Sequence, residues 1–348
     1  MALFEVYDYD RKVWEEELKD FLPKKIIDVH THVYRKEYFD PTFKRKVIRW
    51  PSLVAADDPI EDLQETYRLL FPGKDVKALM FVGGKTGKAQ NNEYLSRVSK
   101  ETGWPALYYS NPAQSADEIE EMIRKGGFLG LKSYLSLAPS YIPTKEVRIF
   151  DFFPKHQLER LNELGAICMC HVPRDGRLKD PVNVAQIAEI KEEFPNVRFI
   201  VAHIGRAYVS TDIGNAFETL DKYPDLMYDF SANCSEYVIT EALRHAGSKH
   251  LMFGTDMPIL RMRTHRIEEN GTYINLVPPG LYGGAEKDPH LREVSEEEAK
   301  EITFFAYEEL LSLKRACETL GLTSSDVEDL MYNNANNLIE GARKSIYG

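Results

Sequence analysis

Short apolar runs alternate along the chain with segments whose apolar positions recur every three or four residues. Eight runs have the length and composition of buried β-strands, at residues 26–32, 76–82, 104–109, 128–134, 167–172, 197–203, 226–231 and 251–256. Helical periodicity falls between most of them, at residues 62–70, 91–102, 115–125, 152–164, 184–194, 213–222 and 236–246. Eight strand–helix units in succession predict an α/β fold, the (β/α)8 TIM barrel.

Further segments extend this repeating pattern at both ends and in two long loops. A leader helix is predicted at residues 13–21, and two terminal helices at residues 325–345. The helix after the last strand is predicted at residues 296–320, because Ser295 and Glu298 have capping-box spacing. Loops as long as 33–58 and 257–294 are often binding loops. We therefore expect one domain over residues 1–348, with a barrel core at about 26–320.

Metal-ligand side chains stand at the ends of four of the predicted strands. The first strand ends in His-x-His, and alternation along a strand places His30 and His32 on the same face. The fifth, sixth and eighth strands end in His171, His203 and Asp256. Histidine and carboxylate are common ligands of zinc and other first-row divalent metals. Active sites of TIM barrels lie at the carboxyl ends of the strands, so the sequence predicts a metal centre there.

Composition narrows the classes of partner and the cellular location. The formal net charge of −11 argues against nucleic acids and anionic membranes, which call for a basic surface. Residues 1–20 lack the apolar core of a signal peptide, and no apolar run is long enough to span a membrane. The four cysteines are too few for a disulfide scaffold. We expect a cytoplasmic protein that acts on a small molecule, and a homo-oligomer is compatible with the sequence.

Several motifs together resemble the amidohydrolase superfamily over about residues 26–340. The matching motifs are Ile27-Asp28-Val29-His30-Thr31-His32, Gly130-Leu131-Lys132, Ala202-His203-Ile204-Gly205, Phe253-Gly254-Thr255-Asp256-Met257-Pro258 and Asn333-Asn334-Ala335-Asn336-Asn337-Leu338. The resemblance is to the amidohydrolase-related branch, which includes aminocarboxymuconate semialdehyde decarboxylase and several lactone hydrolases. It implies that His30, His32, His171 and Asp256 bind one divalent metal, with zinc expected first and manganese as the alternative.

The same resemblance implies catalytic roles for two of these residues. His203 would stay off the metal as an acid or base, and a second interpretation makes it a further ligand. Asp256 or His203 would take the proton of a water molecule that the metal acidifies. Lys132 is expected to contact a substrate carboxylate, while carboxylation of Lys132 to bridge two metals is the alternative.

The predicted mouth of the barrel is basic although the whole chain is acidic. Arginines follow the ligand-bearing strands, at Arg174, Arg177, Arg206, Arg261, Arg263 and Arg266. Arginine binds carboxylates through two parallel hydrogen bonds, so an anionic substrate is expected, with Arg206 and Arg261 as its foremost contacts. Tyr34 and Trp50, in the loop after the first strand, are candidates to line the pocket, although loop aromatics also serve as packing anchors.

These observations predict a metal-dependent hydrolase of a small carboxylate-bearing lactone, amide or ester. A metal-dependent non-oxidative decarboxylase, a lyase acting on a small unsaturated or aromatic acid, would use the same residues. A metal-free lactonase or a ligand-binding protein with this fold is the third interpretation.

Overall fold

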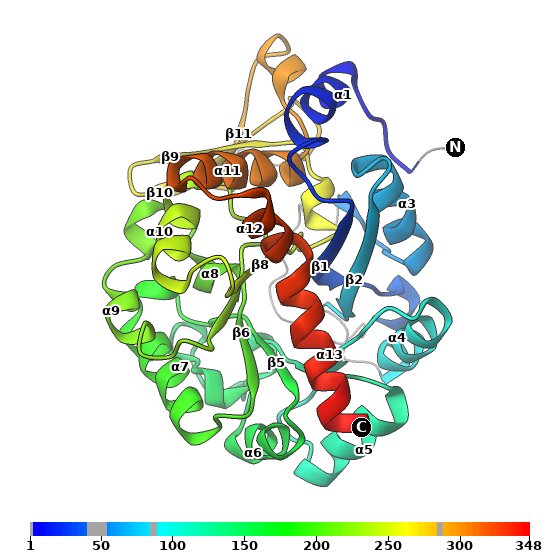
Figure 1. Cartoon of the computed structure of the whole chain (residues 1–348), viewed down its shortest axis with the longest axis vertical. Coiled ribbons are helices and arrows are strands. Elements are labelled where there is room, and N and C mark those ends of the chain that lie inside the picture. The colour runs from blue at the N-terminus through cyan, green and yellow to red at the C-terminus, as the bar shows by residue number, and fades with distance from the viewer. Residues whose placement is uncertain (1–2, 40–53, 84–88, 284–287) are drawn as a thin grey trace.

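The computed structural model describes residues 3–39, 54–83, 89–283 and 288–348. Eight parallel strands form its centre (Figure 1): β1 (Lys25–His32), β2 (Asp75–Phe81), β3 (Tyr108–Tyr109), β4 (Gly130–Lys132), β5 (Ile167–Cys170), β6 (Arg198–Val201), β7 (Met227–Asp229) and β8 (Leu251–Met252). Strands β3 to β8 pair in sequence order, and β1 pairs with β2. Each strand lies within the range predicted from the sequence or differs from it by one residue.

Backbone contacts join these two groups of strands into a closed ring. The amide of Met80 donates to the carbonyl of Pro105 at 2.9 Å, which links β2 to the segment before β3. On the other side, the amide of Val29 donates to the carbonyl of Phe253 at 3.0 Å, next to β8. The parallel sheet thereby closes on itself, and the fold is the predicted TIM barrel.

Helices surround the ring, and one of them closes the end of the barrel where the strands begin. The outer layer contains α3 (Ile60–Leu70), α4 (Ala89–Thr102), α5 (Ala116–Gly126), α6 (Lys155–Leu164), α7 (Pro181–Glu193), α9 (Ala216–Leu220), α10 (Glu236–Ala246) and α11 (Phe305–Leu320). The last helix, α13 (Asn334–Tyr347), packs Ala335, Leu338 and Ile339 onto the apolar side chains that fill the barrel interior. Leu338 shares a cavity with Val197 and Met227, so α13 covers the amino ends of the strands. The carboxyl ends of the strands, at the opposite end of the barrel from α13, are therefore the place where a functional site can lie.

The terminal additions differ from the predictions in their boundaries. The leader helix is α1 (Asp8–Val13), continued by a π-helical turn over Trp14–Leu18. At the C-terminus, α12 (Ser324–Glu328) passes through a second π-helical turn, Asp329–Asn333, into α13. None of the helices in the described parts of the chain is long and apolar enough to cross a membrane.

The predicted helix at residues 296–320 begins later than its capping signal suggests. Ser295 and Glu298 do bond each other reciprocally, but they cap only a 3-10 turn, Glu298–Glu301. The α-helix α11 begins at Phe305, because the backbone before it is extended and Phe304 pairs with Arg263 in an antiparallel bridge. A tertiary strand contact therefore overrides the local capping signal.

The loop predicted at residues 257–294 contains a small sheet of its own. Strands β9 (His265–Glu269) and β10 (Thr272–Val277) form an antiparallel hairpin, and β11 (Leu291–Glu293) pairs with β10. Asn270 and Gly271 at the hairpin turn both have positive φ, as a two-residue turn of this kind requires. The described part of the insertion therefore contains regular β-structure.

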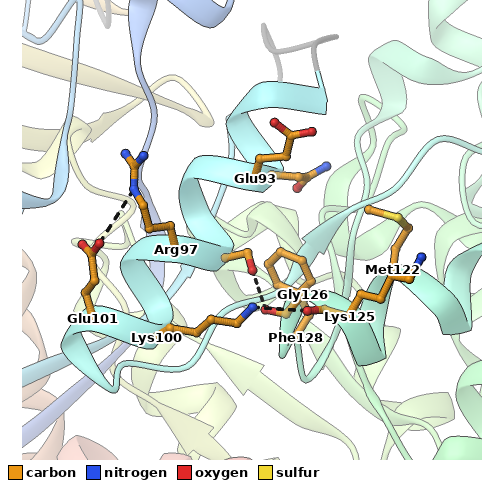
Figure 2. A pocket seen from close by; sticks show the side chains of 10 residues that line it. Glu93, Arg97, Lys100, Glu101, Met122, Lys125, Gly126 and Phe128 are labelled. Carbon is orange, nitrogen blue, oxygen red and sulfur yellow. Dashed lines mark hydrogen bonds and ion pairs between the residues drawn. The ribbon is translucent and has the colours of Figure 1, made fainter.

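The outer helical layer also contains a surface cavity of about 630 Å³ between α4 and α5 (Figure 2). Charged side chains line it, including Arg97, Lys100 and Lys125, and the ammonium group of Lys100 donates to the carbonyl of Lys125 at 3.2 Å. None of the predicted site residues lines this cavity.

Candidate metal centre

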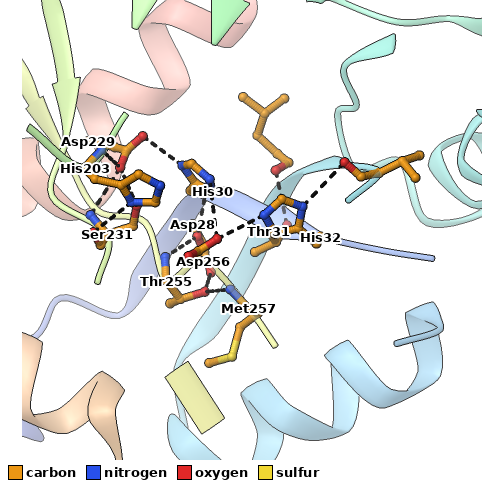
Figure 3. A network of polar contacts seen from close by, with 12 residues as sticks. Asp28, His30, Thr31, His32, His203, Asp229, Ser231, Thr255, Asp256 and Met257 are labelled. Carbon is orange, nitrogen blue, oxygen red and sulfur yellow. Dashed lines mark hydrogen bonds and ion pairs between the residues drawn. The ribbon is translucent and has the colours of Figure 1, made fainter. Parts of the chain in front are cut away.

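The first strand brings two histidines to the carboxyl end of the barrel (Figure 3). His30 is buried, and its Nδ1 lies 3.0 Å from a carboxylate oxygen of Asp229 at the end of β7. His32 directs its Nε2 to the carboxylate of Asp256 at 3.0 Å. Since Nδ1 of His30 is held by Asp229, its Nε2 is the ring atom left for a ligand role.

Asp256 completes a carboxylate–histidine cluster with these two rings. The same oxygen that contacts His32 lies 3.6 Å from Nε2 of His30. Burial opposes ionisation of Asp256, but the hydrogen bond from His32 and the neighbouring histidines lower its pKa to about 2. The backbone also approaches closely here, because a Cβ added at Gly254 would lie 2.8 Å from the Cβ of His30. The absence of a side chain at Gly254 thus lets β8 bring Asp256 to the histidines.

The orientation of the His203 ring is fixed by Ser231. Its Nδ1 lies 3.0 Å from the carbonyl oxygen and 2.8 Å from the hydroxyl oxygen of Ser231. Ser231 donates its hydroxyl proton to Asp229, so both oxygens near the ring act as acceptors and the proton of the neutral ring resides on Nδ1. Burial lowers the pKa of His203 to about 4, so the ring is neutral at pH 7. Its Nε2 is consequently free to accept a proton or to bind a metal.

His171 lies at the edge of the cluster. Its ring centroid is 5.3 Å from that of His203, and Tyr134 stacks on it at 5.2 Å. Burial lowers the pKa of His171 well below the ordinary value, and the nearby Arg206 adds to this effect. Nδ1 of His171 is buried and has no hydrogen-bond partner in the described part of the chain.

The donor atoms are close enough to share one cation. One donor atom each of His30, His203 and Asp256 lies within 4.8 Å of the others, and His32 contacts the same Asp256 carboxylate. Imidazole nitrogens, the ionised carboxylate of Asp256 and an unpartnered nitrogen on His171 are donor types that suit zinc or manganese. Among the described residues, the cluster that could share a cation is therefore His30, His203 and Asp256. Of the other two predicted ligands, His32 reaches this cluster through Asp256 and His171 lies outside it.

Two buried aspartates that the sequence interpretation did not assign support these ligands. Asp229 accepts from His30, from Ser231 and from the backbone amide of His203. Burial alone would raise the pKa of Asp229, but His30 and His203 hold it well below the ordinary value. Asp28 accepts from the amides of His30 and Thr255 at 3.0 and 2.9 Å, which ties β1 to the residues after β8. Asp28 lies within the predicted strand 26–32, and Asp229 lies within the predicted strand 226–231. Their positions in these strands were the feature of the sequence that could have indicated a role beside the histidines.

Lys132 is buried beside the cluster, where the carboxylates of Asp229 and Asp256 stabilise its charged form. Its ammonium group has no hydrogen-bond partner among the described residues and lies 5.0 Å from the ring centroid of Phe81. Burial lowers its pKa. Tyr109 is its partner in the register of β3 and β4, and the Tyr109 hydroxyl is likewise buried and unpartnered in this set of residues. An anionic or polar group of a substrate would satisfy both side chains.

The two foremost arginine candidates have different environments. Arg206 is half-buried next to His171, and its guanidinium makes only long contacts of 3.4 Å with the carbonyls of Val172 and Arg174. Arg261 is instead held in a buried ion pair with Asp58 at 2.6 Å. The structure thus leaves the guanidinium of Arg206 available to a substrate, whereas that of Arg261 already has a carboxylate partner.

The other predicted contacts are mostly engaged elsewhere. Tyr34 is buried, packs against Phe39 and donates to the carbonyl of Ala55 at 3.1 Å, which is a packing role. Trp50 lies outside the described residues. The remaining arginines pair with acidic residues, as in Arg174–Asp180, Arg177–Asp212 and Arg263–Asp10, except for Arg266, which has no carboxylate partner in the described chain.

Comparisons with known proteins agree with this fold. The family model described as Amidohydrolase matches residues 27–274, and this chain belongs to that family. No curated protein matches the sequence. Similar solved structures include amidohydrolase 2 from Bifidobacterium longum subsp. infantis, with 14% identity, a TM-score of 0.52, and coverage of 91% of this chain and 99% of that one.

Other similar structures have names that cover two kinds of chemistry. A putative 2-pyrone-4,6-dicarboxylic acid hydrolase from Pseudomonas putida has 18% identity and a TM-score of 0.52, covering 92% of this chain and 99% of that one. A dihydroxybenzoic acid decarboxylase from a Polaromonas species, solved with manganese and an inhibitor, has 14% identity and a TM-score of 0.52, covering 94% and 100%. At these identities the likeness establishes the fold and leaves hydrolase and decarboxylase activity equally open.

Proposed function

We propose that this chain is a metal-dependent hydrolase of a small carboxylate-bearing lactone, amide or ester. The observation that carries the proposal is the convergence of His30, His203 and Asp256, whose donor atoms lie within 4.8 Å. His30, His32, His171 and Asp256 would hold one divalent cation, with zinc first and manganese as the alternative. When bound, the cation would supply a Lewis acid that polarises a substrate oxygen and makes a water molecule more acidic.

The state of His203 supports a hydrolytic role. Its Nδ1 carries the proton that Ser231 accepts, and its pKa of about 4 keeps the ring neutral, so Nε2 can take a proton from water. Asp256, ionised in its own cluster, is the second group able to accept that proton. A decarboxylase would need a group that delivers a proton to carbon, for which a neutral His203 is less suited.

The proposed substrate class rests on two basic side chains, because Lys132 has no hydrogen-bond partner among the described residues and Arg206 makes only long hydrogen bonds to carbonyl oxygens. Lys132 is proposed to contact a substrate carboxylate, and Arg206 is proposed to bind an anionic group beside His171. Arg261 and Tyr34 stay as weaker proposals because both are engaged within the protein. The cytoplasm is the proposed location, and the four free cysteines suit that reducing compartment.

The second candidate is a metal-dependent decarboxylase of an aromatic or unsaturated acid. It is supported by the aromatic rings of Phe81 and Tyr134 that flank Lys132, and by decarboxylases among the similar structures. The test is a substrate panel of lactones, carboxylated amides and esters, and benzoates, assayed with and without zinc or manganese. Release of acid from the first groups supports the hydrolase, and release of carbon dioxide from benzoates supports the lyase.

A further inference from the structure

The turn after β7 determines how His203 is oriented. Ser231 presents two oxygens to Nδ1 of His203, and Asp229 accepts both the Ser231 hydroxyl and the His203 amide (Figure 3). A displacement of Ser231 would therefore change the direction of the His203 ring and the hydrogen bond that fixes its proton. The position of this turn is thus important for any proton transfer at Nε2.

This turn has a backbone conformation that its sequence does not favour. Ala232 has φ of 55°, in the left-handed region that residues with a Cβ avoid. Such a conformation persists where the surrounding structure holds it. Asn233, which follows, donates its side-chain amide to the carbonyl of Ala207 at 2.7 Å, so the turn is also tied to the segment after His203.

Arg266 of β9 contacts the turn from the inserted sheet. Its guanidinium donates to the carbonyl of Ala232 at 2.6 Å and to the side chain of Asn275 at 2.8 Å. The aromatic rings of Tyr273 and Phe305 flank it, each with its centroid 4.4 Å from the guanidinium carbon. Arg266 therefore has a fixed position, with the strained residue as its hydrogen-bond acceptor.

Glu309 of α11 approaches the turn from the helical layer. Its side chain is fully buried, and its carboxyl group lies near the backbone amides of Ala232 and Asn233, with neither oxygen hydrogen-bonded to any described residue. The amide of Asn233 donates to the carbonyl of Phe230 at 3.1 Å, so the amide of Ala232 is the nearer candidate donor. One helical turn later, Ser312 donates to the carbonyl of Cys234 at 2.9 Å. A buried acid is costly unless its polar atoms are used, and the amide of Ala232 is a donor that this turn offers.

We propose that Arg266 and Glu309 are positioning residues that hold the Ser231–Asn233 turn from two sides and thereby fix the ring of His203. Arg266 binds the carbonyl of Ala232, and the carboxyl group of Glu309 lies against the amide side of the same residue. Neither residue needs to touch the substrate. The expected effects on kcat and KM rest on the proposed function. The expected effect on the orientation of the His203 ring does not.

The test uses pairs of variants in the full-length protein. Glu309→Gln keeps a side-chain oxygen for the amide of Ala232, and Glu309→Met removes it at similar size; Arg266→Lys and Arg266→Met form the second pair. The matched control is Arg292→Met, which removes an exposed arginine of the same inserted sheet that pairs with Glu269. Circular dichroism and metal content identify any variant that fails to fold or to bind metal.

The first measurement is a two-bond proton–nitrogen correlation spectrum of the histidine rings in zinc-loaded protein. Wild type should show the Nδ1-protonated form of His203, assigned with His203→Asn. We expect this signal to shift or broaden in Glu309→Met and Arg266→Met, and to be preserved in Glu309→Gln and Arg292→Met. An unchanged His203 signal in both methionine variants would overturn the proposal, as would an equal disturbance in Arg292→Met.

The second measurement separates kcat from KM on whichever substrate the panel identifies. Each methionine variant should lose about 10- to 100-fold in kcat, as for other groups that orient a site residue, with KM and metal content unchanged. A loss confined to KM would overturn the positioning role. If wild type shows no metal-dependent turnover, the proposed function fails while the histidine spectra still decide this inference.

Discussion

The carboxylate of Asp229 accepts a hydrogen bond from Nδ1 of His30 at 3.0 Å, so the His30 ring is oriented through the nitrogen opposite its proposed metal-binding atom, Nε2. We predict that Asp229→Asn weakens metal affinity about 10- to 100-fold without unfolding the protein, because the oriented ring and its basicity are partly lost. Competition with a chelator measures this affinity. Asp225→Asn is the control, since Asp225 pairs with Lys191 away from the cluster, and equal affinity in both variants would contradict the prediction.

His203 is expected to act on a proton and not to hold the metal. His203→Asn should retain the cation and lose about 10²- to 10⁴-fold in kcat, the range that a general base contributes. Metal content and steady-state kinetics on the same preparation measure both quantities. Loss of the cation with the ring would assign His203 as a ligand, which its proximity to His30 and Asp256 also allows.

Arg206 and Arg261 should respond in opposite ways to the same substitution. Arg206→Met should raise KM and leave stability nearly unchanged, because Arg206 has only long contacts to carbonyl oxygens. Arg261→Met should lower the free energy of unfolding by about 3–5 kcal/mol, since it leaves Asp58 buried without its partner. Urea unfolding and Michaelis curves for both variants test the pair. A KM effect confined to Arg261→Met would reverse the assignment.

Lys132 offers a test of one metal against two. With an unmodified lysine that contacts a substrate carboxylate, Lys132→Met should raise KM and keep the metal content of wild type. With a carboxylated lysine that bridges two metals, the variant should lose metal, and added bicarbonate should activate wild type. We expect the first result, because Lys132 is buried with no partner among the residues that the structure describes.

Glu309 should make the stability depend on pH in a defined direction. Burial raises its pKa well above the ordinary value, so the folded protein keeps this proton where the unfolded chain has lost it. Stability from this group is complete below the unfolded pKa of about 4.3 and falls as the pH rises above it. Glu309→Gln should therefore gain stability relative to wild type, by at most about 1.4 kcal/mol per pH unit. The urea midpoints of wild type and Glu309→Gln are measured from about pH 5 to about pH 8. A difference between the two midpoints that does not change with pH would contradict this prediction.

The barrel and its ligand-bearing ends could be predicted because each depends on local pattern. Apolar runs marked all eight strands, and the parity of His30 and His32 together with the strand ends at His171, His203 and Asp256 placed these side chains at one end. The ion pair of Arg261 could not be predicted in the same way, since its partner Asp58 is far away in sequence and no local pattern reveals a buried ion pair.

Other features depended on contacts that a sequence pattern does not contain. Asp229 and Glu309 matter because the fold brings them to His30 and to the Ser231–Asn233 turn. The inserted sheet, in contrast, could have been predicted in part. Asn270-Gly271 between alternating segments is a recognised hairpin signal, and the loop prediction for residues 257–294 did not use it. Its consequence is functional, because that hairpin carries Arg266 to the turn beside His203.

We propose above that His30, His32, His171 and Asp256 hold one divalent cation. The most direct measurement is the metal content per chain, by inductively coupled plasma mass spectrometry, of protein purified without a polyhistidine tag and reconstituted with zinc or manganese. We predict about one equivalent in wild type and almost none in His30→Asn with its fold intact. Wild-type protein that stays free of metal after reconstitution would contradict the claim.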